Sequence, residues 1–342
     1  MKENYIDYKK MLIDILRLLN SYFIFPKKLI LIHTNKFTKY KIVNTSEIEA
    51  VSKKIQSRNI GNTMEEELIN SFVFDLKKTI SEEYLNIGIE NIKQINCYSS
   101  EFINFFFALL CYGGVYISRI NSICISTKGN KEVLYHELLH AMSAFKCNDL
   151  FIIGFRHKNI GHAINEGYTD LLAKRLLNIK KFSYNIGYPY EAIVSNIIEL
   201  IIGQNTMYSL YFNGDLSGLI NTLSKYQPKD NVMDFITNLD KINKITYLRL
   251  VSSVKDFNEN IYLNNLYNKV NIFLYDLLSN KFDKCYTIDD INSYLCESKK
   301  IIDLINLLDK YTTFEREKQI FNHKTEVKWL WKRIIVLSVK IF

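Results

Sequence analysis

The sequence predicts a predominantly helical α+β fold, and three of its features support that prediction. Over most of the second half, apolar residues recur at the three- and four-residue spacing of amphipathic helices. The first half adds short runs rich in Ile, Val and Tyr, which are typical of strands. With only 12 Gly and 3 Pro in 342 residues, the chain lacks the many turns that a sandwich needs. We therefore expect a small mixed sheet packed with helices.

The N-terminal region, residues 1–112, is predicted to mix helices with short strands. The expected elements are helices over 5–20 and 46–58, strands over 28–33 and 40–43, one long or two short helices over 64–87, and a strand over 93–98. The uncharged stretch 102–117 is divided by Gly113 and Gly114. We therefore expect a buried helix to about Tyr112 and a strand from Val115, rather than a membrane span.

The core, residues 113–228, is predicted to begin with a β-hairpin. Strand patterns over 115–119 and 122–126 flank a short turn, and two buried helices follow. From about residue 190 the pattern is helical nearly to the end. The last region, 229–342, is expected to be helical and either separate from the core or continuous with it. The expected helices are 190–202, 205–212, 215–226, 231–250, 257–280, 287–310 and 314–340.

Residues 136–140 read His-Glu-Leu-Leu-His, which predicts a metal site. On a helix, His136 and His140 lie one turn apart on the same face. Two neutral imidazoles at this spacing can bind one Zn²⁺ at about 2.0–2.1 Å. The flanking residues are apolar, and two histidines and a glutamate in a buried helix need a partner that satisfies them. Glu137 then lies beside the metal, where it can serve as general base for a water.

A second motif, Asn-Glu-Gly-Tyr-Thr-Asp at 165–170, supplies the remaining groups of the predicted site. Glu166 is the candidate third metal ligand, which leaves a fourth position open, as in catalytic rather than structural zinc sites. Asp170, one helical turn on, is expected to accept the free ring N–H of a ligand histidine. Gly167, beside the ligand, is expected to let the two motif helices approach closely.

These two motifs together resemble the thermolysin-like gluzincins, a group of zinc metallopeptidases. Over residues 115–175, the resemblance implies a zincin-like core with an edge hairpin before the first motif helix. It implies His136, His140 and Glu166 as ligands, Glu137 as base and Asp170 as their support. The metzincin pattern would need Gly and His where the chain has Ser143 and Lys146. An aspzincin-type site, with Asp170 as ligand in place of Glu166, remains an alternative.

A peptidase of this kind also needs a Tyr or His that stabilises the oxyanion. His157 lies nine residues before Glu166, where the similar enzymes carry a Tyr in that role, and His162 lies one turn before it. His33 and His323 are interpreted as structural. The further candidates are Tyr184, Tyr188, Tyr190, Tyr208 and Tyr211.

The predicted function is zinc-dependent hydrolysis of peptide bonds in a protein or peptide substrate, by a metal-activated water with Glu137 as general base. One Zn²⁺ per chain is expected. The alternative is a non-hydrolytic zinc-binding scaffold or regulatory protein that keeps a gluzincin-like site. Because a scaffold has no need for a base at position 137, Glu137 favours hydrolysis.

Composition limits the other functions. The net charge of +8 comes from scattered Lys without an Arg cluster or recognisable module, so we expect no nucleic-acid partner. Six Cys without paired spacing predict reduced thiols of an intracellular protein. The N-terminal apolar stretch is interrupted by Asp14 and Arg17 and has no small-residue cleavage site, so a cytoplasmic protein is expected. The tail 327–342 is expected to dock as a helix, in preference to a membrane surface. The oligomeric state is not predicted.

Overall fold

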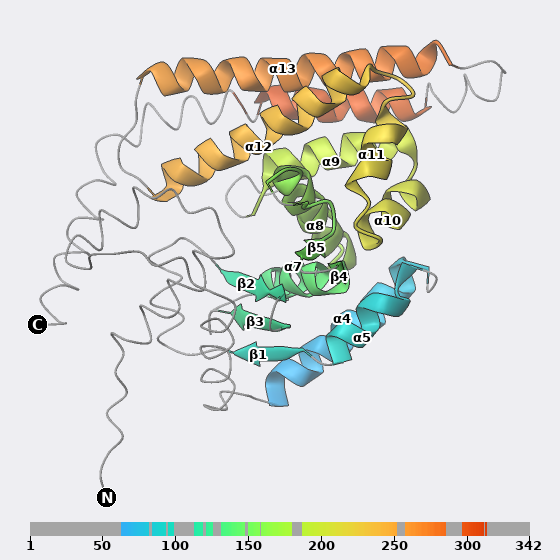
Figure 1. Ribbon diagram of the computed structural model, residues 1–342, viewed down its shortest axis with the longest axis vertical. Helices are drawn as coiled ribbons and strands as arrows, with labels where there is room; N and C mark the ends of the chain where they lie inside the picture. Colours follow the sequence, from blue (N-terminus) through green and yellow to red (C-terminus); the bar gives the residue numbers. More distant parts are fainter. Residues whose placement is uncertain are drawn as a thin grey trace, which may run out of the picture.

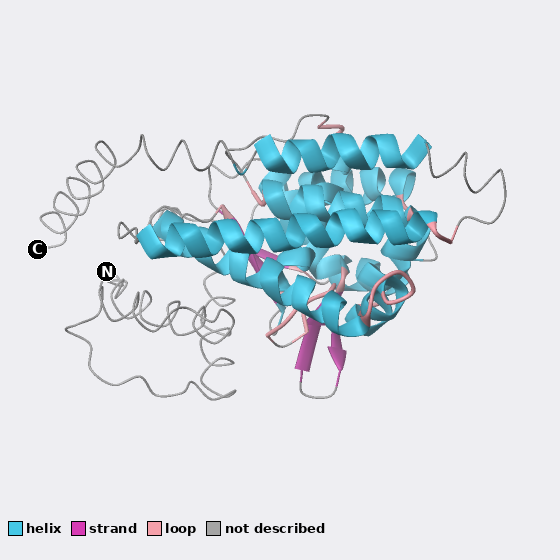
Figure 2. Ribbon diagram, turned by 90° about the horizontal axis from the view of Figure 1, so that it is seen from above, coloured by secondary structure: helices cyan, strands magenta, loops and turns pink. Residues whose placement is uncertain are grey.

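A computed structural model gives the fold of the chain (Figure 1). It describes residues 63–81, 84–93, 95–98, 113–118, 121–125, 131–147, 150–157, 159–179, 187–251, 257–284, 296–310 and 312. Some predictions lie outside the described residues: the elements over 5–20, 28–33, 40–43, 46–58, 102–112 and 314–340, the tail 327–342, and His33, Tyr184 and His323. The described part is mostly helical, as Figure 2 shows, and the predominantly helical α+β class is confirmed.

A three-stranded mixed sheet precedes the first motif helix. Its strands β1 (Asn96–Tyr98), β2 (Gly114–Ile117) and β3 (Ser122–Ile125) lie in the order β1-β3-β2. Strands β2 and β3 form the predicted antiparallel hairpin, and β1 runs parallel to β3. The strand that leads into the helix, β3, is central, so β2 rather than β3 is the described edge strand on the hairpin side. The predicted hairpin before the first motif helix is therefore present at one end of the described sheet, whereas a zincin-like core stays a prediction.

The predicted strand over 93–98 is shorter than expected, because a helix occupies its start. Helix α5 (Asn86–Lys93) extends to Lys93, and β1 begins only at Asn96. Ile92 is 3% exposed and belongs to the hydrophobic core, which favours the helical conformation there. Before it, α4 (Thr63–Thr79) takes up most of the region predicted as one or two helices.

Between the two motif helices the chain forms a second hairpin that the sequence analysis did not predict. Strands β4 (Ala144–Cys147) and β5 (Leu150–Ile153) pair antiparallel, with Ala144 opposite Ile153. The chain leaves β5 through Gly154, whose φ of 50° lies in the left-handed region that suits glycine. This hairpin returns the chain from the end of one motif helix to the start of the other.

From α9 to α13, the helices of the C-terminal half begin and end close to the predicted residues; of the helix predicted over 287–310, the structure describes residues 296–310. These helices are α9 (Pro189–Ile202), α10 (Gln204–Phe212), α11 (Leu216–Leu223), α12 (Lys229–Val251), α13 (Phe257–Phe282) and a further helix over 296–310. Pro189 occupies the first turn of α9, where its missing N–H costs no hydrogen bond. No helix within the described ranges is both long enough and apolar enough to cross a membrane.

Helix α8 (His162–Leu176), which carries the second motif, lies at the centre of the arrangement. It packs against α7 (Lys131–Met142) on one side and against α9 and α12 on others (Figure 1). A buried hydrophobic cluster runs from Phe72 in α4 through these helices to Leu308. The division into regions 1–112, 113–228 and 229–342 stays a prediction, but their described parts share this cluster.

At Gly167, helix α8 lies very close to the backbone of a neighbouring helix, α9. A Cβ at Gly167 would lie 2.3 Å from both the carbonyl carbon and the carbonyl oxygen of Glu191. Ordinary carbon contacts are about 3.5–4.0 Å long, so only glycine fits at this point. Gly167 was expected to let the two motif helices, α7 and α8, approach closely. The close contact is with α9 instead, so the prediction named the wrong neighbour.

Candidate metal centre

The two histidines of the first motif share one buried face of α7. His136 is 9% exposed and His140 is 8% exposed, in a helix whose residues 134–142 are all buried. Their Nε2 atoms are 3.1 Å apart. Because two ring nitrogens cannot both accept at that distance, a proton or a metal ion must lie between them.

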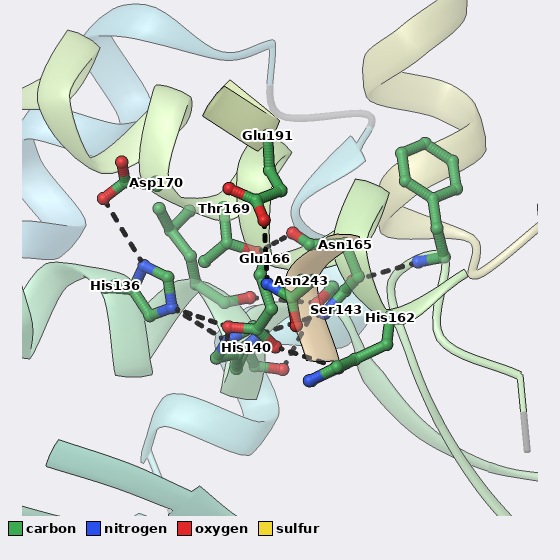
Figure 3. Close-up of polar contacts among 12 residues, drawn as sticks. His136, His140, Ser143, His162, Asn165, Glu166, Thr169, Asp170, Glu191 and Asn243 are labelled. Atoms are coloured by element: carbon green, nitrogen blue, oxygen red, sulfur yellow. Dashed lines mark hydrogen bonds and ion pairs between the residues drawn. The ribbon is translucent and has the colours of Figure 1, made fainter. Parts of the chain in front are cut away.

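Helix α8 brings Glu166 to the same point, as Figure 3 shows. Its Oε2 lies 3.2 Å from His136 Nε2 and 3.3 Å from His140 Nε2. The three atoms therefore form a nearly equilateral triangle. In a tetrahedral zinc site with bonds of about 2.0–2.1 Å, neighbouring ligand atoms are about 3.3 Å apart. The spacing of the ligand atoms of His136, His140 and Glu166 thus fits a metal ion. Among the described residues, these three form a group that could hold one.

The electrostatics of this group favour a bound cation. Burial opposes charge on His136, but the hydrogen bond to Glu166 and the nearby carboxylates outweigh it and raise the pKa of His136 to about 9. Burial likewise opposes charge on Glu166, yet the two histidines hold the pKa of this carboxyl well below its usual range. A proton and a metal ion therefore compete for the same negative pocket.

Glu137 lies on the side of α7 that faces strand β2, next to the ligand triangle. It is 7% exposed, and burial raises the pKa of its carboxyl, whereas a backbone hydrogen bond from Tyr116 on β2 lowers it. A Cβ at Gly114 would lie 3.0 Å from the Glu137 side chain, so the strand packs directly on this carboxylate. The base predicted from the motif is thus buried between the ligand helix and the sheet.

Asp170 lies beside His136 but does not reach it as predicted. Its Oδ1 is 3.9 Å from Nδ1 of His136, which is too long for a hydrogen bond. The other carboxylate oxygen accepts from Lys174 Nζ at 2.5 Å, and both side chains are buried. Lys174 was missed by the sequence analysis, although its spacing of four from Asp170 on a buried helix was a signal for it.

Asn165 is a second residue whose role the sequence analysis missed. Its Nδ2 lies 3.4 Å from Nδ1 of His140, and its Oδ1 accepts the backbone N–H of Phe155 at 3.0 Å. The amide therefore places the loop after β5 against the outer side of a ligand ring. Its position directly before Glu166 in the motif was the available signal.

Of the two histidines considered for oxyanion stabilisation, the structure brings His162 to the site. Its Nδ1 lies 3.5 Å from Oε1 of Glu166, and its side chain is 34% exposed. Its Nδ1 atom is nevertheless buried, and loss of solvation lowers the pKa of His162 to about 4, so the imidazole is neutral at pH 7. His157 is exposed, in the turn that precedes α8.

Among the candidate tyrosines, Tyr188 is the one that stacks on a ligand. Its ring is 5.8 Å from that of His136 between centroids, at an interplanar angle of 21°. The other described candidates belong to the core or to other networks. Tyr190 packs on Tyr267, Tyr208 accepts from Arg175, and Tyr211 shares a hydrogen bond with Thr169.

The start of α8 is fixed by a residue from the C-terminal region. The carboxylate of Asp240, on α12, accepts the backbone N–H of Gly161 at 2.8 Å and that of Ala163 at 2.7 Å. The N-cap residue itself, Gly161, supplies no side-chain acceptor. Asp240 thus satisfies N–H groups that would otherwise be left without a partner at the helix start.

No family model matches the chain, and neither a curated protein nor a solved structure gives a significant match. The resemblance to gluzincins therefore depends on the two motifs alone. What the structure adds is a buried His136, His140 and Glu166 group whose ligand atoms lie close enough together to hold a metal ion.

Proposed function

We propose that the chain is a zinc-dependent peptide hydrolase of the gluzincin class. The observation that carries this proposal is the ligand triangle, with sides of 3.1, 3.2 and 3.3 Å between His136, His140 and Glu166. A buried carboxylate, Glu137, adjoins it on the same helix. A purely structural zinc site needs four protein ligands and no base, so this donor set favours catalysis.

The roles of the residues follow from their places. When bound, the metal lowers the pKa of a water and polarises the substrate carbonyl. Glu137 takes a proton from the attacking water and passes it to the leaving amine. His162 and Tyr188 are the groups near the ligands that could donate to the oxyanion, and His162 adjoins Glu166 on the more exposed side.

The substrate proposed is an extended peptide, because the sheet offers it an edge. Strand β2 is at the end of the described sheet order, and its Gly114 packs on Glu137. A peptide that adds to this edge through backbone hydrogen bonds would place its carbonyls beside the base. Binding at the edge of β2 would therefore recognise the main chain of the substrate rather than one particular side chain.

The first test is the zinc content, by plasma emission, of the wild type and of His140→Ala, Glu166→Ala and His157→Ala. About one zinc per chain is expected in the wild type and in His157→Ala, the matched histidine control, with loss in the other two. Absence of zinc from the wild type, even after zinc is added back, would overturn the proposal.

The second test is cleavage of a peptide library by the zinc-loaded protein. The wild type should cleave, and Glu137→Gln should bind zinc but lose cleavage by about 10²–10⁴-fold, the usual contribution of a general base. Equal zinc content in the two proteins makes the comparison valid. Zinc binding without cleavage by the wild type would instead favour the scaffold alternative.

A further inference from the structure

A lysine is buried about two helical turns after the metal ligand Glu166. Lys174 on α8 is 3% exposed, and its ammonium lies 2.5 Å from Oδ2 of Asp170. Lysine is almost never fully buried unless it is paired. Because this charge is buried, the loss of either partner would leave an uncompensated charge inside the protein.

Lys174 also links the two helices that carry the ligands. Besides Asp170, its Nζ lies 3.9 Å from Oε1 of Glu132 on α7. Glu132 is one turn before His136, and Asp170 is one turn after Glu166. A single ammonium therefore attracts one carboxylate on each ligand helix, next to the ligand triangle.

The pair with Lys174 also fixes which oxygen of Asp170 faces the metal site. Lys174 takes Oδ2, and Oδ1 is the oxygen that lies 3.9 Å from His136 Nδ1. On the other side, a Cβ at Gly187 would lie 2.7 Å from Oδ1, so the backbone of Gly187 packs on the carboxylate. Held between these groups, Asp170 has little freedom to turn away from His136.

We propose that Lys174 is a positioning residue for the metal centre. It holds the carboxylate of Asp170 toward His136, and through Glu132 it fixes the spacing between α7 and α8. Because it acts on metal binding, the inference rests on the proposed zinc site but not on hydrolysis. Groups that orient a metal-bound histidine typically change metal affinity by about 10–100-fold when they are lost.

The experiment compares Lys174→Met with a neighbouring control on the same helix, Arg175→Met. Arg175 also forms an ion pair, in which its partly exposed guanidinium lies 2.6 Å from the buried Glu199, but that partner is on α9 and not on a ligand helix. Zinc affinity is measured by competition with a chelator, below the melting temperature of each variant, and the melting temperature of the metal-free protein is measured in parallel.

The expected result distinguishes a positioning role of Lys174 at the metal centre from a purely structural role. Both variants should melt at a lower temperature, since each leaves a buried carboxylate without its cation. Only Lys174→Met should weaken zinc binding, by about 10–100-fold, and Lys174→Arg should recover most of that loss. Unchanged zinc affinity in Lys174→Met, or an equal loss in Arg175→Met, would overturn the inference and leave Lys174 a structural residue.

A double variant covers the case in which Lys174→Met does not fold. Asp170→Asn/Lys174→Met removes both charges and should fold, since a buried pair can be replaced without a stranded ion. It should bind zinc about as weakly as Asp170→Asn alone; affinity equal to the wild type would refute the proposal. A wild type that binds no zinc would instead refute the proposed function itself, and this inference with it.

Discussion

Replacing Gly167 by Ala tests whether the contact between α8 and α9 is as close as the structure indicates. The added Cβ would lie 2.3 Å from backbone atoms of Glu191, against an ordinary contact of about 3.5 Å. The two helices must therefore separate by about 1 Å locally. The obstacle is backbone rather than a flexible side chain, so the cost should be at the upper end of overpacking, about 3 kcal/mol.

The sign of the net stability change in Gly167→Ala shows whether α8 and α9 are in close contact at this residue. Alanine is favoured over glycine within a helix by about 1 kcal/mol, so the net loss of stability should be about 2 kcal/mol. Without the close contact, the same substitution would stabilise the protein by about 1 kcal/mol. The geometry therefore predicts a destabilisation where helix propensity alone predicts a gain.

Urea unfolding of the metal-free proteins measures this difference. With an m-value of about 3 kcal/mol/M, the midpoint of Gly167→Ala should fall by about 0.7 M. Zinc affinity should fall as well, since Glu166 is the preceding residue on the displaced helix. A midpoint equal to or above that of the wild type would refute the α8–α9 geometry.

Three further predictions concern metal removal, the start of α8, and pH. Zinc present at about 100 times its Kd stabilises by about 2.7 kcal/mol, so a chelator should lower the melting temperature by about 4 °C, and His140→Ala should show no such difference in calorimetry. Asp240→Ala removes the acceptor for the N–H groups of Gly161 and Ala163 and should cost about 1–2 kcal/mol in urea unfolding, with a smaller loss in Asp240→Asn. Burial raises the pKa of Glu191 from 4.5 to about 7, so the folded protein keeps this proton over a pH range in which the unfolded chain releases it. Its contribution to stability is full below pH 4.5 and is lost as the pH rises through 7. Glu191→Gln should therefore gain up to about 3 kcal/mol over the metal-free wild type between pH 4.5 and 8, and equal pH profiles would contradict this.

The two histidine ligands were predictable from sequence because their relative position depends only on local helix geometry. His136 and His140 are four residues apart, and that spacing alone brings two rings to one face. The helices after residue 187 were predictable for the same reason, since their apolar residues recur over two or more turns. Pro189 and Gly203, at the two ends of α9, also marked its limits.

The strands were harder to predict, because they are three or four residues long and pair with distant partners. Parallel pairing of β1 with β3 joins Asn96 to Ser122, and no periodicity within either segment indicates it. The β4–β5 hairpin had a local signal, since polar Asn148 and Asp149 separate two apolar runs. Such short runs do not by themselves distinguish a strand from part of a helix.

Contacts between charged or polar side chains and distant backbone were not predictable. Asp240 reaches the start of α8 across 77 residues, and nothing in its own helix indicates that role. Tyr188 was one of five candidate tyrosines, but nothing in the sequence indicated that it, and not another of them, stacks on His136. In each case the residue type was ordinary for its local pattern, and only the tertiary arrangement gives it a part in the site.

The metal centre therefore depends unequally on its two helices. One helix, α7, fixes His136 and His140 relative to each other through its own backbone geometry. The position of Glu166 depends instead on contacts along α8: Asp240 at its start, the close approach at Gly167 in its middle, and Lys174 near its end. A shift of α8 moves one corner of the ligand triangle while the other two stay in place. Substitutions at these α8 contacts should therefore change metal affinity more than comparable substitutions on the outer face of α7.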